Sequence, residues 1–289
     1  MMHSQDMPPQ DFAPAARPVA RPMAAVPAQE PPPMARGGDW APAMTRVQAG
    51  LDILAIIVLN FLLQVGLFTT GIPDMLSRQF PTLGPLWVSV CIGVMALIAV
   101  ALVVRVRRQS AAAVGLVRAS PWRVLGYASL AIPVCWAALL ITVPLFIWIA
   151  GRSMEGLIEE RAEFFAEVPH LAIWQAAFFS AFVGLHEEVL FRGFILGRLK
   201  ALFRSNVAAV LISSLVFGLL HFYQGPIGVV QTTSVGIVFA MVVIRSGSLW
   251  PAILAHAAFD TIGLALIPWL ERTLPELLEQ ATSAPTSMP

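Results

Sequence analysis

Seven long apolar segments dominate the sequence and limit what the chain can fold into. They cover approximately residues 49–71, 85–104, 124–150, 171–196, 206–223, 227–244 and 249–268. A helix needs about 20 apolar residues to cross a bilayer. Barrel strands, in contrast, alternate apolar and polar residues over about ten positions, and these segments do not alternate. We therefore expect an all-α integral membrane protein with about seven transmembrane helices.

The composition excludes several classes of soluble protein. Only 12% of the residues are charged and 57% are hydrophobic, whereas about a quarter of a soluble domain is charged. The formal net charge of +1 lacks the basic excess that a nucleic-acid binder needs. Two cysteines, Cys91 and Cys135, lie within apolar segments and cannot form a disulfide framework. We therefore expect the chain to lie in the lipid bilayer and not to bind nucleic acid.

The segments divide the chain into four parts. Residues 1–45 hold ten of the 23 prolines, and we expect a disordered, Pro/Ala-rich cytoplasmic tail because such a composition buries too little apolar surface to fold. Residues 46–169 carry three accessory transmembrane helices. Residues 170–268 carry the last four helices, which we expect to form one functional bundle. Residues 269–289 form a C-terminal tail.

Charges between the segments predict the orientation in the membrane. Basic residues follow the second, fourth and sixth segments, and acidic residues follow the third (Arg105, Arg107, Arg108, Arg118 and Arg123; Arg198, Lys200 and Arg204; Arg245; Glu155, Glu159, Glu160, Glu163 and Glu167). Short loops rich in Lys and Arg remain cytoplasmic. The pattern predicts a cytoplasmic N-terminus and a C-terminus on the outside.

Ionisable residues inside three of the last four segments are the candidate functional groups, because such residues are costly in a membrane. They are Glu187, Glu188, Arg192, His221, His256 and Asp260. Hairpin arithmetic at about 1.5 Å per residue places Glu187, His221 and His256 at one depth in the cytoplasmic half of the membrane. The i,i+4 spacing predicts a Glu188–Arg192 ion pair. Glu187 lies about 100° round the helix from Glu188, and we expect it to point elsewhere and to remain available for chemistry.

Three motifs contain these residues. Glu187-Glu188-Val-Leu-Phe-Arg192 matches EExxxR, Phe217-Gly-Leu-Leu-His221 matches FxxxH, and His256-Ala-Ala-Phe-Asp260 matches HxxxN/D. In this order they resemble the CPBP family (CAAX prenyl protease, Abi or bacteriocin-processing) of intramembrane endopeptidases. The resemblance covers about residues 170–265 and implies a helical bundle whose cavity opens towards the cytosol.

The resemblance also implies roles. Glu187 would be the general base, assisted by His221 in activating a water, and His256 and Asp260 would stabilise the oxyanion. Glu188 and Arg192 would support the site structurally. Relatives often have Asn in place of Asp260. An ionised carboxylate cannot donate a hydrogen bond, so Asp260 is expected to be protonated, to orient His256 or to bind a metal.

Zinc or another divalent metal is the candidate cofactor. His221, His256 and Asp260 would be its ligands, since a catalytic zinc takes three protein ligands. His186-Glu187 starts like HExxH, but residue 190 is Leu, so a zincin helix is excluded. His186 is expected to be structural. The resemblance therefore leaves both a glutamate-dependent and a metal-dependent hydrolase open.

We expect an intramembrane endopeptidase that cuts a peptide or protein substrate near the cytoplasmic face of a prokaryotic plasma membrane. The sequence does not specify the oligomeric state. One alternative is a membrane scaffold or chaperone of the same fold without proteolytic activity. A proton-coupled transporter is less favoured, because the chain lacks the internal repeats typical of transporters.

Overall fold

The computed structural model of the protein describes residues 44–166 and 168–283, and the regular structure within these ranges is entirely helical. The predicted all-α class is thus confirmed. The predicted disordered tail falls almost entirely on residues 1–43, which lie outside the described residues.

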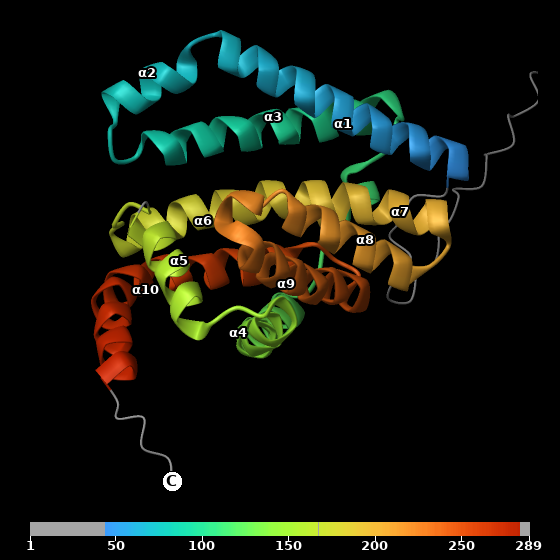
Figure 1. The fold of residues 1–289 in the computed structure, drawn as a ribbon. Coiled ribbons are helices and arrows are strands. Elements are labelled where there is room, and N and C mark those ends of the chain that lie inside the picture. Colours follow the sequence, from blue (N-terminus) through green and yellow to red (C-terminus); the bar gives the residue numbers. More distant parts are fainter. Residues whose placement is uncertain (1–43, 167, 284–289) are drawn as a thin grey trace, which may run out of the picture. The chain divides into compact units, whose positions relative to one another are not determined.

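The N-terminal helices form a hairpin. Helix α1 (Arg46–Thr69) begins at a capping box in which Thr45 and Gln48 bind each other's backbone N–H groups, a strong helix-start signal. Short α2 (Ile72–Gln79) leads into α3 (Gly84–Val106), which packs along α1 and α6. A single 3₁₀ turn, η1 (Ala111–Val114), follows. Figure 1 shows α1 and α3 side by side.

The middle of the chain contains one long and one short helix. Helix α4 (Pro121–Ala150) starts where the Ser120 hydroxyl accepts the Arg123 backbone N–H, and it packs against α9 and α10. Helix α5 (Met154–Ala166) contacts α10. Both α2 and α5 lie in gaps between the predicted spans, where the hydropathy pattern indicated no helix.

The C-terminal half carries the candidate site. Helix α6 (Ile173–Glu188) continues through a π-helical segment, η2 (Val189–Ile195), into α7 (Leu196–Phe203). Helix α8 (Asn206–Leu219) leads through the 3₁₀ turn η3 (Phe222–Gln224) to α9 (Gly225–Ser246), and α10 (Trp250–Ser283) follows. Helix α10 packs against α6, α4 and α9. It extends well beyond residue 268, where the C-terminal tail was expected to begin.

Within residues 44–166 and 168–283, five helices are long and apolar enough to cross a membrane: Arg46–Thr69, Gly84–Val106, Pro121–Ala150, Phe222–Ser246 and Trp250–Trp269. The predicted number of seven is not confirmed. Helix α8 has 14 residues, which is about 21 Å and short of the roughly 30 Å hydrocarbon layer. The fourth apolar segment is divided by the π-helical segment and contains Glu187, Glu188 and Arg192.

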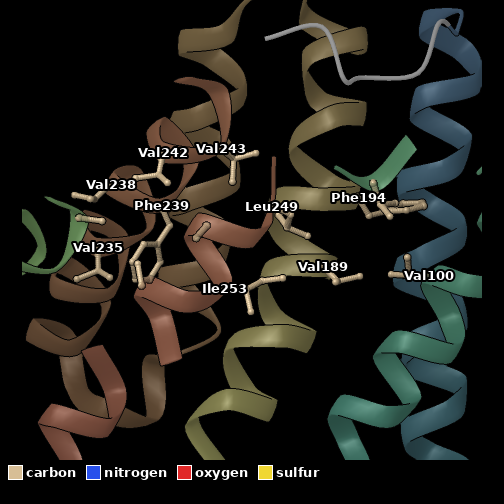
Figure 2. Close-up of a cluster of buried hydrophobic side chains, with 14 of the residues drawn as sticks. Val100, Val189, Phe194, Val235, Val238, Phe239, Val242, Val243, Leu249 and Ile253 are labelled. Atoms are coloured by element: carbon tan, nitrogen blue, oxygen red, sulfur yellow. The ribbon is translucent and has the colours of Figure 1, made fainter. Parts of the chain in front are cut away.

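A buried apolar cluster joins the helices around the site. Figure 2 shows its side chains converging from α3, the π-helical segment, α9 and α10, with Phe194, Phe239 and Leu249 among them. Many large apolar side chains elsewhere are exposed, such as Leu140 on α4 and Phe61 on α1. Lipid is the environment in which an exposed apolar face of this kind is stable.

A buried polar network connects α1 to α7. The carboxylate of Asp52, 1% exposed, lies 2.6 Å from Arg107 Nε and 3.5 Å from Arg198 Nε. Arg198 is fully buried and also donates to Gln109 Oε1 at 2.7 Å and to the Ala113 carbonyl at 3.3 Å. The guanidinium of Arg198 therefore acts as a tie between the N-terminal hairpin and the helices that carry the site.

Candidate active site

The two glutamates of the first motif lie where α6 becomes π-helical. Glu187 and Glu188 are the last two residues of α6, and Arg192 lies within the π-helical segment. Segments of this kind occur frequently at functional sites. Arg192 Nη1 donates to Glu188 Oε1 at 2.8 Å, and both side chains are fully buried. The predicted ion pair is therefore present in the structure.

Aromatic rings surround the Arg192 guanidinium. Its carbon lies 4.1 Å from the ring centroid of Phe217, 5.6 Å from that of Phe239 and 6.0 Å from that of Phe191. A cation over an aromatic face is stabilised by the ring quadrupole, more strongly when water is excluded. Gly236 makes room for this arrangement, since a Cβ there would lie 3.0 Å from Arg192 Nη2.

His256 of α10 is the centre of the cluster. Its Nδ1 lies 2.9 Å from Glu188 Oε1, while its Nε2 lies 3.3 Å from Asp260 Oδ2 and 3.7 Å from Glu187 Oε2. Glu187 and Glu188 thus lie on opposite sides of the same ring, Glu187 towards Nε2 and Glu188 towards Nδ1. Adjacent carboxylates, about 100° apart on the helix, reach the two different nitrogens of one imidazole ring.

Close approach of α6 and α10 makes these contacts possible. A Cβ on Gly184 would lie 3.1 Å from the Ala257 backbone nitrogen and 3.2 Å from the Ile253 carbonyl oxygen. Small residues at helix interfaces allow membrane helices to pack backbone against backbone. Gly184 thus brings the end of α6 within reach of His256.

His221 lies at the turn that follows α8. Its Nδ1 is 2.8 Å from the Phe217 carbonyl oxygen, which can only accept, so Nδ1 carries the hydrogen and Nε2 of a neutral ring keeps its lone pair. The Phe217 ring packs against both histidines, with centroids 4.7 Å from that of His221 and 6.2 Å from that of His256.

One comparison with known proteins finds a family match over the part of the chain that contains this cluster. Residues 169–262 match the family model described as type II CAAX prenyl endopeptidase Rce1-like. The chain carries an Rce1-like domain. The match covers about a third of the chain and is consistent with the CPBP resemblance of the motifs. No curated protein and no solved structure matches the chain. The five long apolar helices among the described residues, together with the match to a membrane-protease family model, indicate an integral membrane protein.

Exposure distinguishes the two glutamates of the Rce1-like domain. The Glu188 side chain is fully buried and contacts both Arg192 and His256, whereas the Glu187 side chain is 18% exposed. Asp260 is 30% exposed. The Glu187 and Asp260 side chains are therefore partly uncovered by the protein, whereas that of Glu188 is fully enclosed.

The structure separates His186 from this cluster. His186 Nδ1 is 3.0 Å from the Phe182 carbonyl oxygen, and its ring lies against Gly93 of α3. Sequence reasoning missed Phe239, whose ring stacks on His256 with centroids 4.9 Å apart. Nothing in the apolar segment that contains Phe239 distinguishes it from its neighbours.

The candidate metal ligands do not assemble into a site. Among the residues that the structure describes, no group of three or more His, Cys, Asp or Glu side chains is placed to hold a metal ion. His256 and Asp260 are in contact, and the Phe217 ring packs against both His221 and His256. This geometry does not fit the three-ligand pattern of a catalytic zinc.

Proposed function

We propose that the protein is an intramembrane endopeptidase that hydrolyses a peptide bond of a peptide or protein substrate, with Glu187 as general base. The contrast between the two glutamates supports this proposal most directly. Glu188 is fully buried with two partners within 2.9 Å, whereas Glu187 is partly exposed and its carboxylate lies 3.7 Å from His256 Nε2. A base must be free to reach the water that it activates.

The proposed reaction begins with a water between Glu187 and His221. Glu187 takes a proton from this water, while the lone pair on His221 Nε2 accepts a hydrogen bond and orients it. The oxygen attacks the scissile carbonyl and forms a tetrahedral oxyanion. Glu187 then returns the proton to the amine as the C–N bond breaks, which leaves a carboxylic acid and a free amine, and the acid passes its remaining proton to the amine to give a carboxylate and an ammonium group.

His256 is the proposed oxyanion donor. As an imidazolium, His256 carries a hydrogen on each ring nitrogen. Its Nδ1 donates to Glu188, and its Nε2, which lies on the Glu187 side of the ring 3.7 Å from that carboxylate, carries the hydrogen offered to the oxyanion. A donor aimed at the developing charge is a large contribution in a water-poor site. Asp260, 3.3 Å from the same nitrogen, orients the imidazole and supports the oxyanion through it. The proposal routes no step through a metal, because His221 does not join the His256–Asp260 pair.

The basic helix ends support the location of this chemistry. Arg105, Arg204 and Arg245 lie at or just after the C-terminal ends of α3, α7 and α9, and such residues favour the cytoplasm. We therefore place cleavage near the cytoplasmic face of a prokaryotic plasma membrane, with the N-terminus inside and the C-terminus outside.

Cleavage of a peptide library by purified protein tests the proposal. Glu187→Gln keeps the shape of the side chain but removes the base, and we expect cleavage to fall at least about 100-fold. Glu155→Gln, an exposed change on α5, is the matched control and should cleave normally. Undiminished cleavage by Glu187→Gln would contradict the proposal that the protein is an endopeptidase. If cells with that variant also kept the wild-type phenotype, a scaffold without proteolytic activity would be the better explanation.

A further inference from the structure

Helix α5 contains one basic residue among several acidic ones. The sequence from Met154 to Ala166 includes Glu155, Glu159, Glu160 and Glu163, and its sole cation is Arg161. This helix precedes residue 169, where the match to the Rce1-like family begins. Its composition indicates a solvated segment between two spans, and the role of its single arginine is not evident from the sequence.

Arg161 reaches across to the turn between α8 and α9. Its Nη2 donates to the Gln224 carbonyl oxygen at 3.2 Å, and its Nη1 donates to Gln231 Oε1 at 3.3 Å. Gln224 is the last residue of η3, and Gln231 is in α9. The two hydrogen bonds therefore tie α5 to both the turn and the helix that follows it.

The same turn determines where His221 lies. The Gln224 N–H donates to the His221 carbonyl at 2.9 Å, and the His221 N–H donates to the Gly218 carbonyl at 2.9 Å. Gly225 follows with a φ of 78°, a conformation that glycine adopts without steric cost. Gln224 is thus held at both of its backbone groups, by His221 on one side and by Arg161 on the other.

The η3 turn needs hydrogen-bond partners outside itself to be held in place. A one-turn 3₁₀ helix provides few internal hydrogen bonds, and a half-buried backbone carbonyl is costly to leave without a partner. The two donors of a guanidinium fork also fix direction better than the single point charge of a lysine.

We propose that Arg161 is a positioning residue for His221, acting through the backbone of Gln224. This inference rests on the proposed function only where it concerns catalysis. Its structural part, that Arg161 immobilises the η3 turn, can be measured without any substrate.

Hydrogen exchange by mass spectrometry, on the full chain in lipid nanodiscs, tests the structural part. We expect Arg161→Ala to speed amide exchange in the peptide covering residues 221–225 about fivefold, as loss of a hydrogen bond allows, and to leave α3 unchanged. Arg161→Lys should restore part of the protection. Arg78→Ala on the exposed surface of α2 is the control and should match wild type. Unchanged exchange at the turn in Arg161→Ala would overturn the inference.

A second variant keeps the test informative if Arg161→Ala fails to fold. Gln231→Leu removes one acceptor and leaves the arginine in place, so we expect a smaller rise in exchange at the same turn. Wild-type exchange in Gln231→Leu would then overturn the inference.

The catalytic part of the inference is tested by measuring cleavage kinetics with the library peptide that the wild-type protein cleaves fastest. We expect Arg161→Ala to lower kcat about tenfold with KM unchanged, and Arg161→Lys to recover part of the loss. A wild-type kcat in Arg161→Ala, together with faster amide exchange at the turn, would refute the inference that Arg161 positions His221 for catalysis. Full cleavage by Glu187→Gln would instead refute the proposed function, and the exchange result would still decide whether Arg161 holds the turn.

Discussion

His256 and Glu188 are 68 positions apart in the chain and meet at 2.9 Å between Nδ1 and Oε1. Because Glu188 Oε1 also accepts from Arg192, one buried carboxylate connects α6, the π-helical segment and α10. An ionised carboxylate that accepts from both groups keeps a hydrogen on His256 Nδ1 and fixes the direction of the ring.

Loss of the Glu188 charge should destabilise the protein. In Glu188→Gln the Arg192 guanidinium remains fully buried without its counter-charge, which costs about 3–5 kcal/mol for a pair of this kind. A marked drop in the thermal unfolding midpoint in detergent would show this. The exposed change Glu155→Gln should not move the midpoint. Equal midpoints for the two variants would mean that the pair contributes little.

Replacing Asp260 tests how it acts on His256. Asp260→Asn keeps a side-chain oxygen near His256 Nε2 and adds an amide that can donate to an oxyanion, so we expect library cleavage at or above the wild-type level. Asp260→Ala leaves the imidazole unsupported and should lower kcat about 10- to 100-fold. If Asp260→Asn were as inactive as Glu187→Gln, the carboxylate itself would have to take part in the chemistry.

The close contact at Gly184 should be sensitive to a single methyl group. In Gly184→Ala the new Cβ would press on the α10 backbone, and overpacking of this kind costs about 1–3 kcal/mol. We expect lower thermal stability and weaker cleavage, because His256 moves away from the glutamates. Gly263→Ala on α10 is the control, since a Cβ there meets nothing within 4 Å. Equal behaviour of the two variants would contradict tight α6–α10 packing.

The buried ion-pair network between α1 and α7 should stabilise the fold, although it is distant from the candidate site. Asp52→Asn removes the buried charge that faces Arg107 and Arg198, and we expect about 3 kcal/mol of lost stability. Thermal unfolding in detergent measures this loss. Asp74→Asn, on the exposed surface of α2, is the control and should have the wild-type unfolding midpoint. A wild-type midpoint for Asp52→Asn would contradict a stabilising role of the network.

Hydropathy and spacing predicted the parts of the fold that depend on local sequence. Each apolar segment coincides with helical structure, and the i,i+4 rule anticipated the contact of Glu188 with Arg192. This prediction succeeded because both residues lie on one continuous helical stretch.

Features that depend on tertiary packing were not predictable from one sequence. The π-helical segment uses the same residue types as an α-helix, so no periodicity distinguishes Val189–Ile195. The meeting of Glu187 and Glu188 on one imidazole requires the crossing of α6 and α10 at Gly184. The contact of Arg161 with Gln224 spans 63 positions, and only the position of α5 against the bundle brings it about.

Comparative peptidomics tests the central claim most directly, because it detects cleavage of whichever membrane substrate the protein cuts. Membranes from cells that express wild-type protein, Glu187→Gln or the control Glu155→Gln would be compared for newly formed peptide ends. The account predicts a set of ends shared by wild type and Glu155→Gln and missing from Glu187→Gln. Identical sets of peptide ends in all three samples, at equal protein levels, would contradict it.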